Sequence, residues 1–389
     1  MINRLVRLFI QDCDNVTDPA VREKYGVLSG AVGIVLNLLL SAGKFFAGVV
    51  TGSIAITADA FNNLSDAGSS VVTLVGFKLA GQKADDGHPF GHGRAEYLAG
   101  LLVSLMILLV GLELGKTSIG KILHPEAVDF SLLAVGILVA SIAVKLYMYL
   151  YNRRISRRIS SAAMEATATD SLSDAIATTA VLAAMLVGRF TALMIDGWVG
   201  LVVACFILFS GYQAAKETLG PLLGQPPEQE LVERIRQMVL SHPPICGIHD
   251  LVVHDYGPGR MMVSLHAEVP AHGDILELHD VIDTAEMELK RTLHCNAVIH
   301  MDPIITDDAQ IVQLRRRVAE LVRQVDSGMT IHDFRVVPGP SHTNLIFDAV
   351  LPFGEHITEA EAARQIRERV RQMDGGEYYA VVTVENPYV

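Results

Sequence analysis

Six long apolar runs within the first 220 residues constrain this 389-residue chain more than any other feature. A helix crosses the apolar core of a bilayer with about 20 residues, and each run is long enough to do so. The runs predict six transmembrane helices, at residues 28–50, 54–80, 95–117, 128–151, 163–187 and 190–215. From residue 217 onward the composition is that of a soluble chain, so the sequence predicts a membrane domain followed by an aqueous one.

The net charge and the cysteines of the chain exclude some classes of partner and of structural site. The net charge of −12 disfavours nucleic acid as a partner. The four cysteines are scattered along the chain and predict neither a disulfide framework nor a zinc knuckle. Residues 1–25 begin with a short apolar stretch, which predicts a cytoplasmic amphipathic segment on the membrane lipid surface.

Basic residues set the expected orientation in the membrane. Arg153, Arg154, Arg157 and Arg158 stand between the fourth and fifth predicted spans. Loops rich in arginine and lysine stay on the cytoplasmic side. We therefore expect the loop at 81–94 and both termini of this multi-pass protein to lie in the cytoplasm, with the chain in the plasma or inner membrane.

Two predicted spans carry polar residues that are costly in lipid. Asn62 and Asp66 lie in one span, Asp170 and Asp174 in another, and both pairs are spaced i, i+4. Residues at this spacing lie on one face of a helix. A carboxylate in mid-membrane costs about 2.5–3.5 kcal/mol on insertion scales, and a bound divalent cation would remove that cost. The four residues predict an oxygen-lined metal site, whereas a single such residue would suggest only a hydrogen bond between helices.

Four motifs together resemble the cation diffusion facilitator family of divalent-metal exporters. They are "NNLSD" and "DSLSD" in the two polar spans, "DDGHPFGHGRAE" after the second span, and "VIHMDP" near residue 300. The resemblance implies six transmembrane helices, a cytoplasmic α+β ferredoxin-like domain of αββα type, and a homodimer. It also implies a transporter, not an enzyme, which exchanges a cytosolic metal ion for protons by alternating access.

The expected transport site favours manganese. None of the 14 histidines falls within a predicted span, so the site offers one amide and three carboxylates. Hard oxygen ligands suit Mn²⁺, whereas imidazole favours Zn²⁺. The Asn-Asp/Asp-Asp set also resembles the manganese-type branch of the family. We expect Mn²⁺ as the transported ion and Asp66, Asp170 and Asp174 as proton carriers; Zn²⁺, Fe²⁺ and Co²⁺ remain alternatives.

A second metal site is expected in the loop after the second span. Asp85, His88 and His92 have the spacing to hold one ion on a short loop, and the resemblance assigns a metal site to these positions. The alternative is a rigid turn around Pro89 whose histidines contact a dimer partner or lipid headgroups.

The resemblance also assigns a metal site to the cytoplasmic domain, where exposed strand histidines without a metal are the alternative interpretation. Its expected ligands are His249, His266, His279, His300 and Asp302.

Residues 309–389 repeat this domain in sequence. "IHDFRVV" parallels "IHDLVVH", and "VTVENP" parallels "VIHMDP". His332 is retained in register with His249. At the other ligand positions the aligned residues are Asp348, Val384 and Asn386, which predicts a second ferredoxin-like repeat whose metal ligands are degenerate.

The expected domains are therefore residues 1–25, the transport domain at 26–216, the metal-binding and dimerisation domain at 217–308, and the repeat at 309–389. Two other functions are alternatives to transport. A non-transporting metal sensor or scaffold predicts a damaged membrane site, but four oxygen donors are present. An intramembrane hydrolase needs an aspartate dyad that shares one proton, and two i, i+4 pairs fit a metal better.

Overall fold

The computed structural model describes residues 6, 9–10, 13–16, 18–51, 54–124, 132–191, 196–305, 307–339, 341–354 and 357–387. The chain divides into two compact units. The first contains residues 1–225 with 255–260, and the second contains residues 226–254 with 261–389. Ten residues of the expected amphipathic segment at 1–25 lie outside the described residues. The last part of that segment belongs to a long helix that begins at Pro19.

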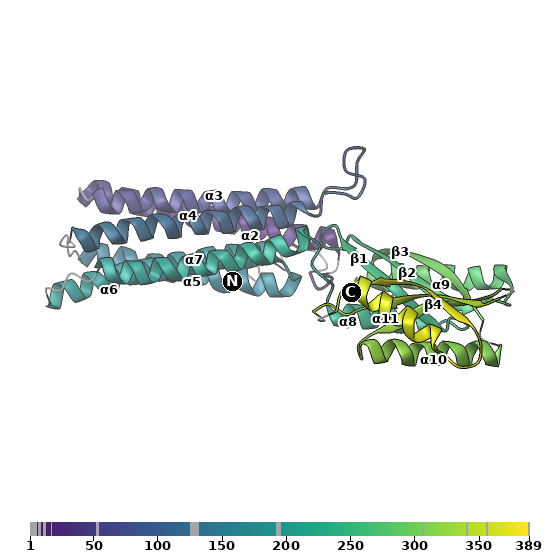
Figure 1. The fold of residues 1–389 in the computed structure, drawn as a ribbon. Coiled ribbons are helices and arrows are strands. Elements are labelled where there is room, and N and C mark those ends of the chain that lie inside the picture. Colours follow the sequence, from purple (N-terminus) through teal and green to yellow (C-terminus); the bar gives the residue numbers. More distant parts are fainter. Residues whose placement is uncertain are drawn as a thin grey trace. The chain divides into compact units, whose positions relative to one another are not determined.

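Within the described residues, the first unit contains six long helices, which run side by side in Figure 1. They are α2 (Pro19–Thr51), α3 (Ile54–Ala80), α4 (Ala95–Leu123), α5 (Leu132–Ile159), α6 (Ala162–Thr191) and α7 (Asp196–Leu222). All except α3 are long and apolar enough to cross a membrane. Asn62, Asn63 and Asp66 lower the mean hydropathy of α3. The chain is a multi-pass membrane protein with a helical membrane domain, as the sequence predicted.

The helices extend beyond the predicted spans. The expected basic loop is helical, because α5 continues through Arg153, Arg154, Arg157 and Arg158 to Ile159. Only residues 160–161 separate α5 from α6. Hydropathy marks where apolar side chains stop, whereas arginine is a good helix former that carries the helix onward. The basic cluster therefore lies on the last turns of a helix.

The second unit contains two copies of one αββαβ arrangement (Figure 1). The first copy comprises α8 (Gln229–Leu240), β1 (Gly247–Asp255), β2 (Met261–Pro270), α9 (Ile275–Leu293) and β3 (Cys295–Ile304). The second comprises α10 (Ala309–Val325), β4 (Thr330–Pro338), β5 (Thr343–Val350), α11 (Glu359–Arg371) and β6 (Tyr378–Glu385). The sheet orders, β1-β2-β3 and β4-β5-β6, are the same, and β3 and β6 pair in parallel with the central strands.

Each repeat has its own hydrophobic core. Inward-facing residues of the central strand, such as Leu265 in the first repeat and Leu345 in the second, are fully buried. Val239 and Leu289 of α8 and α9 belong to the first core, and Val322 belongs to the second. Alternation along each strand places every second side chain on the opposite face of its sheet, away from the helices. Of the histidines expected to bind metal, His249, His266 and His300 lie on these strands.

Candidate metal sites

In the membrane domain, carboxylates of two helices converge on one ammonium group. Nζ of Lys145 on α5 lies 2.6 Å from Oδ2 of Asp66 on α3 and 2.6 Å from Oδ2 of Asp174 on α6. The three side chains are 2%, 9% and 11% exposed, respectively. The structure thus brings together two of the four expected ligands around a cation that belongs to the protein.

The other two expected ligands differ in their placement. Asp170 lies near enough to Asp174, Asp66 and Lys145 for their charges to interact. Asn62, in contrast, is exposed, and its neighbour Asn63 is buried. With its amide oriented so that both atoms find partners, Asn63 donates to Oδ2 of Asp66 at 3.2 Å and accepts from Nζ of Lys44 at 2.9 Å. The amide beside the carboxylates in this structure is therefore that of Asn63.

Lys44 and Lys145 are functional candidates that the sequence analysis did not place in the site. Both side chains are almost completely buried. One general property could have identified both lysines from the sequence: ionisable residues within a membrane pair with each other. Three aspartates in two predicted spans required cationic partners, and lysines in neighbouring spans were the residues able to supply them.

The expected loop site is assembled between α3 and α4. Asp85, His88 and His92 each offer one ligand atom within a common distance of 4.8 Å. Oδ1 of Asp85 lies 3.4 Å from Nδ1 of His88, and its Oδ2 lies 3.6 Å from Nε2 of His92. The backbone N–H of His88 donates to Asp85 and lowers the pKa of that carboxyl. The carboxylate is therefore ready to bind a cation, on a loop open to solvent.

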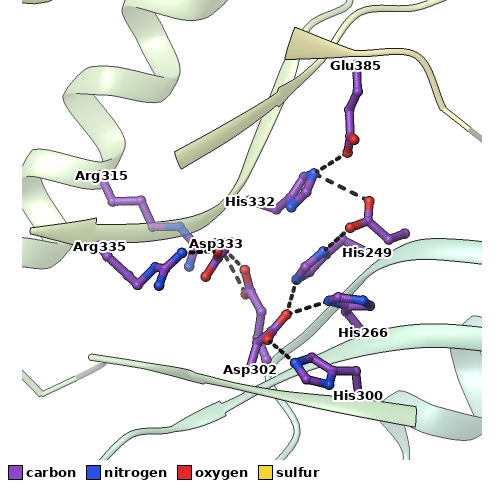
Figure 2. Close-up of polar contacts among 11 residues, drawn as sticks. His249, His266, His300, Asp302, Arg315, His332, Asp333, Arg335 and Glu385 are labelled. Carbon is purple, nitrogen blue, oxygen red and sulfur yellow. Dashed lines mark hydrogen bonds and ion pairs between the residues drawn. The ribbon is translucent and has the colours of Figure 1, made fainter. Parts of the chain in front are cut away.

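The cytoplasmic site gathers three histidines around one carboxylate, as Figure 2 shows. Oδ2 of Asp302 lies 2.8 Å from Nδ1 of His266 and 3.1 Å from Nε2 of His249. Oδ1 of the same residue lies 3.3 Å from Nε2 of His300. Burial lowers the pKa of His249, and the neighbouring His332 lowers it further. A neutral imidazole binds metal, so this environment favours the metal-competent form of His249.

His279 is not brought to this group. It lies on α9, is 68% exposed, and its Nδ1 is 3.6 Å from Oδ2 of Asp283. Within one chain, the expected five-residue set therefore reduces to His249, His266, His300 and Asp302.

The strand register changes the alignment of the second repeat. His266 pairs with His300 on the adjacent strand, two residues before Asp302. In the second repeat, Asp348 pairs with Thr383, two residues before Glu385. Glu385 therefore takes the place of Asp302, and the expected alignment with Asn386 and Val384 was one residue out of register. A shift by one residue reverses the face of every side chain, so the observed register places the carboxylate of Glu385 on the ligand face.

His332 of the second repeat meets His249 of the first. Their rings stack with centroids 4.2 Å apart. Nε2 of His332 lies 3.5 Å from Oδ1 of Asp250 and 3.3 Å from Oε1 of Glu385. Burial and the negative charge of Asp250 raise the pKa of Glu385. The two repeats thus share a continuous group of imidazoles and carboxylates.

Comparison with known proteins agrees with this geometry. The cation efflux transmembrane domain matches residues 31–223, and the cytoplasmic domain of cation efflux proteins matches residues 227–304. The uncharacterized transporter MJ0449 of Methanocaldococcus jannaschii is 30% identical over 276 residues, 70% of this chain and 96% of that protein. The cation-efflux pump FieF of Salmonella typhimurium is 30% identical over 291 residues, 73% of this chain and 95% of the pump. With both domains matched and carboxylates converging on a cation among its apolar helices, the chain belongs to the cation efflux family of membrane transporters.

Proposed function

We propose that this chain exports Mn²⁺ from the cytosol in exchange for protons, by alternating access at a site formed by Asp66, Asp170 and Asp174. One observation carries the proposal: carboxylates from α3 and α6 meet at a single cation, Nζ of Lys145, inside an apolar helical bundle. Buried carboxylates in such a bundle are expensive unless a cation accompanies them. The arrangement suits a site that exchanges one cation for another.

The donor set supports manganese. No histidine of the chain lies in α2 to α7, so carboxylate and amide oxygens are the ligands available around Asp66 and Asp174. Mn²⁺ binds weakly compared with later transition metals, and a site favours it by withholding nitrogen and sulfur ligands. Zn²⁺, Fe²⁺ and Co²⁺ are the alternative cargoes.

Proton exchange follows from the same side chains. When the ion leaves, negative charge must be neutralised by Lys145 and by protons on the aspartates. An aspartate that accepts a proton on one side of the membrane and releases it on the other couples metal export to proton entry. Asn63 and Asn62 are neutral amides and take no part in that exchange.

The remaining parts fit an exporter that acts as a homodimer in the plasma or inner membrane, with both termini in the cytoplasm. The arginine-rich end of α5 supports this orientation. The loop group around Asp85 and the group around Asp302 would each hold a divalent ion on the cytoplasmic side. A non-transporting sensor or scaffold is the rival function, and it predicts a damaged membrane site.

A flux measurement tests the proposal. We expect liposomes containing the purified protein to move Mn²⁺ in response to a pH gradient, faster than Zn²⁺, Fe²⁺ or Co²⁺ at equal concentration. Metal-dependent proton movement in the opposite direction should accompany it. Transport of Zn²⁺ in preference to Mn²⁺ would refute the manganese assignment, and absence of flux for all four ions would refute transport.

Proton coupling is expected to depend on Asp170 and not on Asn62. Asp170→Asn removes a carboxylate whose charge interacts with Asp66 and Asp174, so proton-driven transport should fall strongly. Asn62→Asp changes an exposed position and should leave most coupling intact. The ratio of protons to metal ions moved, measured for both variants, compares them directly. Equal losses would show that Asp170 has no special role in coupling.

A further inference from the structure

We propose that Asp250, His332 and Glu385, together with Nδ1 of His249, form a second divalent-metal site in the aqueous unit, between its two repeats. The site would bind an ion that accepts imidazole and carboxylate donors, such as Zn²⁺ or Co²⁺. The site goes beyond the transport proposal and does not depend on it. His332 and Glu385 belong to residues 305–389, which lie beyond both matched family domains.

His249, Asp250 and His332 each offer one ligand atom, and these atoms lie within 4.8 Å of one another, with Glu385 next to His332. His249 Nδ1 lies 3.3 Å from Oδ2 of Asp250. His332 Nε2 lies 3.5 Å from Oδ1 of Asp250 and 3.3 Å from Oε1 of Glu385. Bonds of about 2.0–2.1 Å from a tetrahedral Zn²⁺ place neighbouring donors about 3.3–3.4 Å apart. The measured separations exceed ordinary hydrogen-bond lengths and are close to this donor spacing, with His249 and His332 facing different oxygens of Asp250.

The histidines also lack the partners that buried rings normally have. The side chain of His332 is 7% exposed and that of His249 is 9% exposed. Within the described residues, none of their four ring nitrogens makes a hydrogen bond. Buried polar atoms are seldom left unsatisfied, and each exception calls for an explanation. An ion bound to Nδ1 of His249 and Nε2 of His332 supplies one.

The duplicated fold builds this site from equivalent positions. His332 is the counterpart of His249, and Glu385 is the counterpart of Asp302. In both repeats the next residue is an aspartate in the left-handed region, with φ 49° at Asp250 and 50° at Asp333. The two aspartates differ in their contacts. Asp333 pairs with Arg335 at 2.7 Å, whereas Asp250 faces the two histidines.

An ion pair joins the two repeats. Arg315 of α10 donates to both carboxylate oxygens of Glu268 on β2, at 2.8 and 3.1 Å (Figure 2 shows Arg315). His249 presents Nε2 to Asp302 and Nδ1 to Asp250, so it lies between two sets of ligands. If both sets hold an ion, His249 must lose its ring proton and bridge the two ions.

Counting bound metal tests the site directly. The full-length protein in detergent would be stripped with a chelator, dialysed against Zn²⁺ or Co²⁺, and assayed for ions bound per chain. We expect His332→Ala and Glu385→Gln each to bind one ion fewer than the wild-type chain. His342→Ala is the matched control, because His342 lies in the same repeat and contacts Ser341 and Tyr379 instead. It should bind the wild-type number.

Co²⁺ spectra separate a metal site from a structural role. A tetrahedral Co²⁺ absorption present in the wild-type chain should weaken in Glu385→Gln, a variant of nearly unchanged shape. If both site variants bind the wild-type number of ions and keep the full Co²⁺ spectrum, His332 serves only in ion pairing and the proposed site is overturned. Metal counts do not depend on flux, so failure of this site and failure of the transport proposal are distinguishable.

Discussion

Asp66→Asn is expected to reduce metal transport to the background level of empty liposomes. Loss of a supporting residue around a metal ligand already costs roughly 10–100-fold in affinity or activity, and loss of a ligand should cost more. Asp66 is buried, and it is the residue of α3 that shares a cation with α6. The asparagine keeps the size of the side chain but loses the charge that both the metal ion and the proton require.

The matched control for this variant is Ser65→Ala, because Ser65 is the preceding residue of α3 and is exposed. It should transport at the wild-type rate. Initial rates of Mn²⁺ entry into liposomes, corrected for the amount of folded protein inserted, are the measurement. Wild-type rates for Asp66→Asn would place the transport site elsewhere in the membrane domain.

Sequence periodicity predicted the carboxylates of the membrane site but not their surroundings. Asp66, Asp170 and Asp174 were identifiable because charges at helical spacing inside an apolar run have few explanations. The sequence could not predict which amide, that of Asn62 or that of Asn63, lies next to Asp66, because both residues lie within about one helical turn of Asp66. The rotation of α3 decides which amide is buried, and that rotation depends on packing against other helices.

In the second unit, too, the sequence predicted the helices and strands but not all of the contacts between them. Alternating apolar residues and the paired "IHD" segments predicted two αββαβ repeats, and the structure has this arrangement. The register between β5 and β6 was not predictable, because β6 is joined to β5 through a helix and its apolar and polar residues alternate weakly. The contact between His249 and His332 joins residues far apart in the chain, so only the packing of the repeats reveals it.

Lys145→Met is expected to destabilise the metal-free protein more than the metal-bound protein. The ammonium bonds to both Asp66 and Asp174, and removing one partner of a buried ion pair costs about 3–5 kcal/mol. Mn²⁺ can replace the missing charge, and it no longer has to displace an ammonium group. Since a ligand stabilises the state that binds it, Mn²⁺ should raise the unfolding temperature of the variant more than that of the wild-type chain.

Thermal unfolding in detergent, with a chelator and with Mn²⁺, gives the comparison. Lys116→Met is the matched control, because Lys116 is exposed on α4, and it should leave both unfolding temperatures unchanged. A purely structural lysine would lower the unfolding temperature of Lys145→Met equally in both conditions. The predicted difference between the conditions arises only if the ammonium and the metal compete for the same carboxylates. In that case Lys145 acts as an internal cation that holds the transport site together between one metal ion and the next.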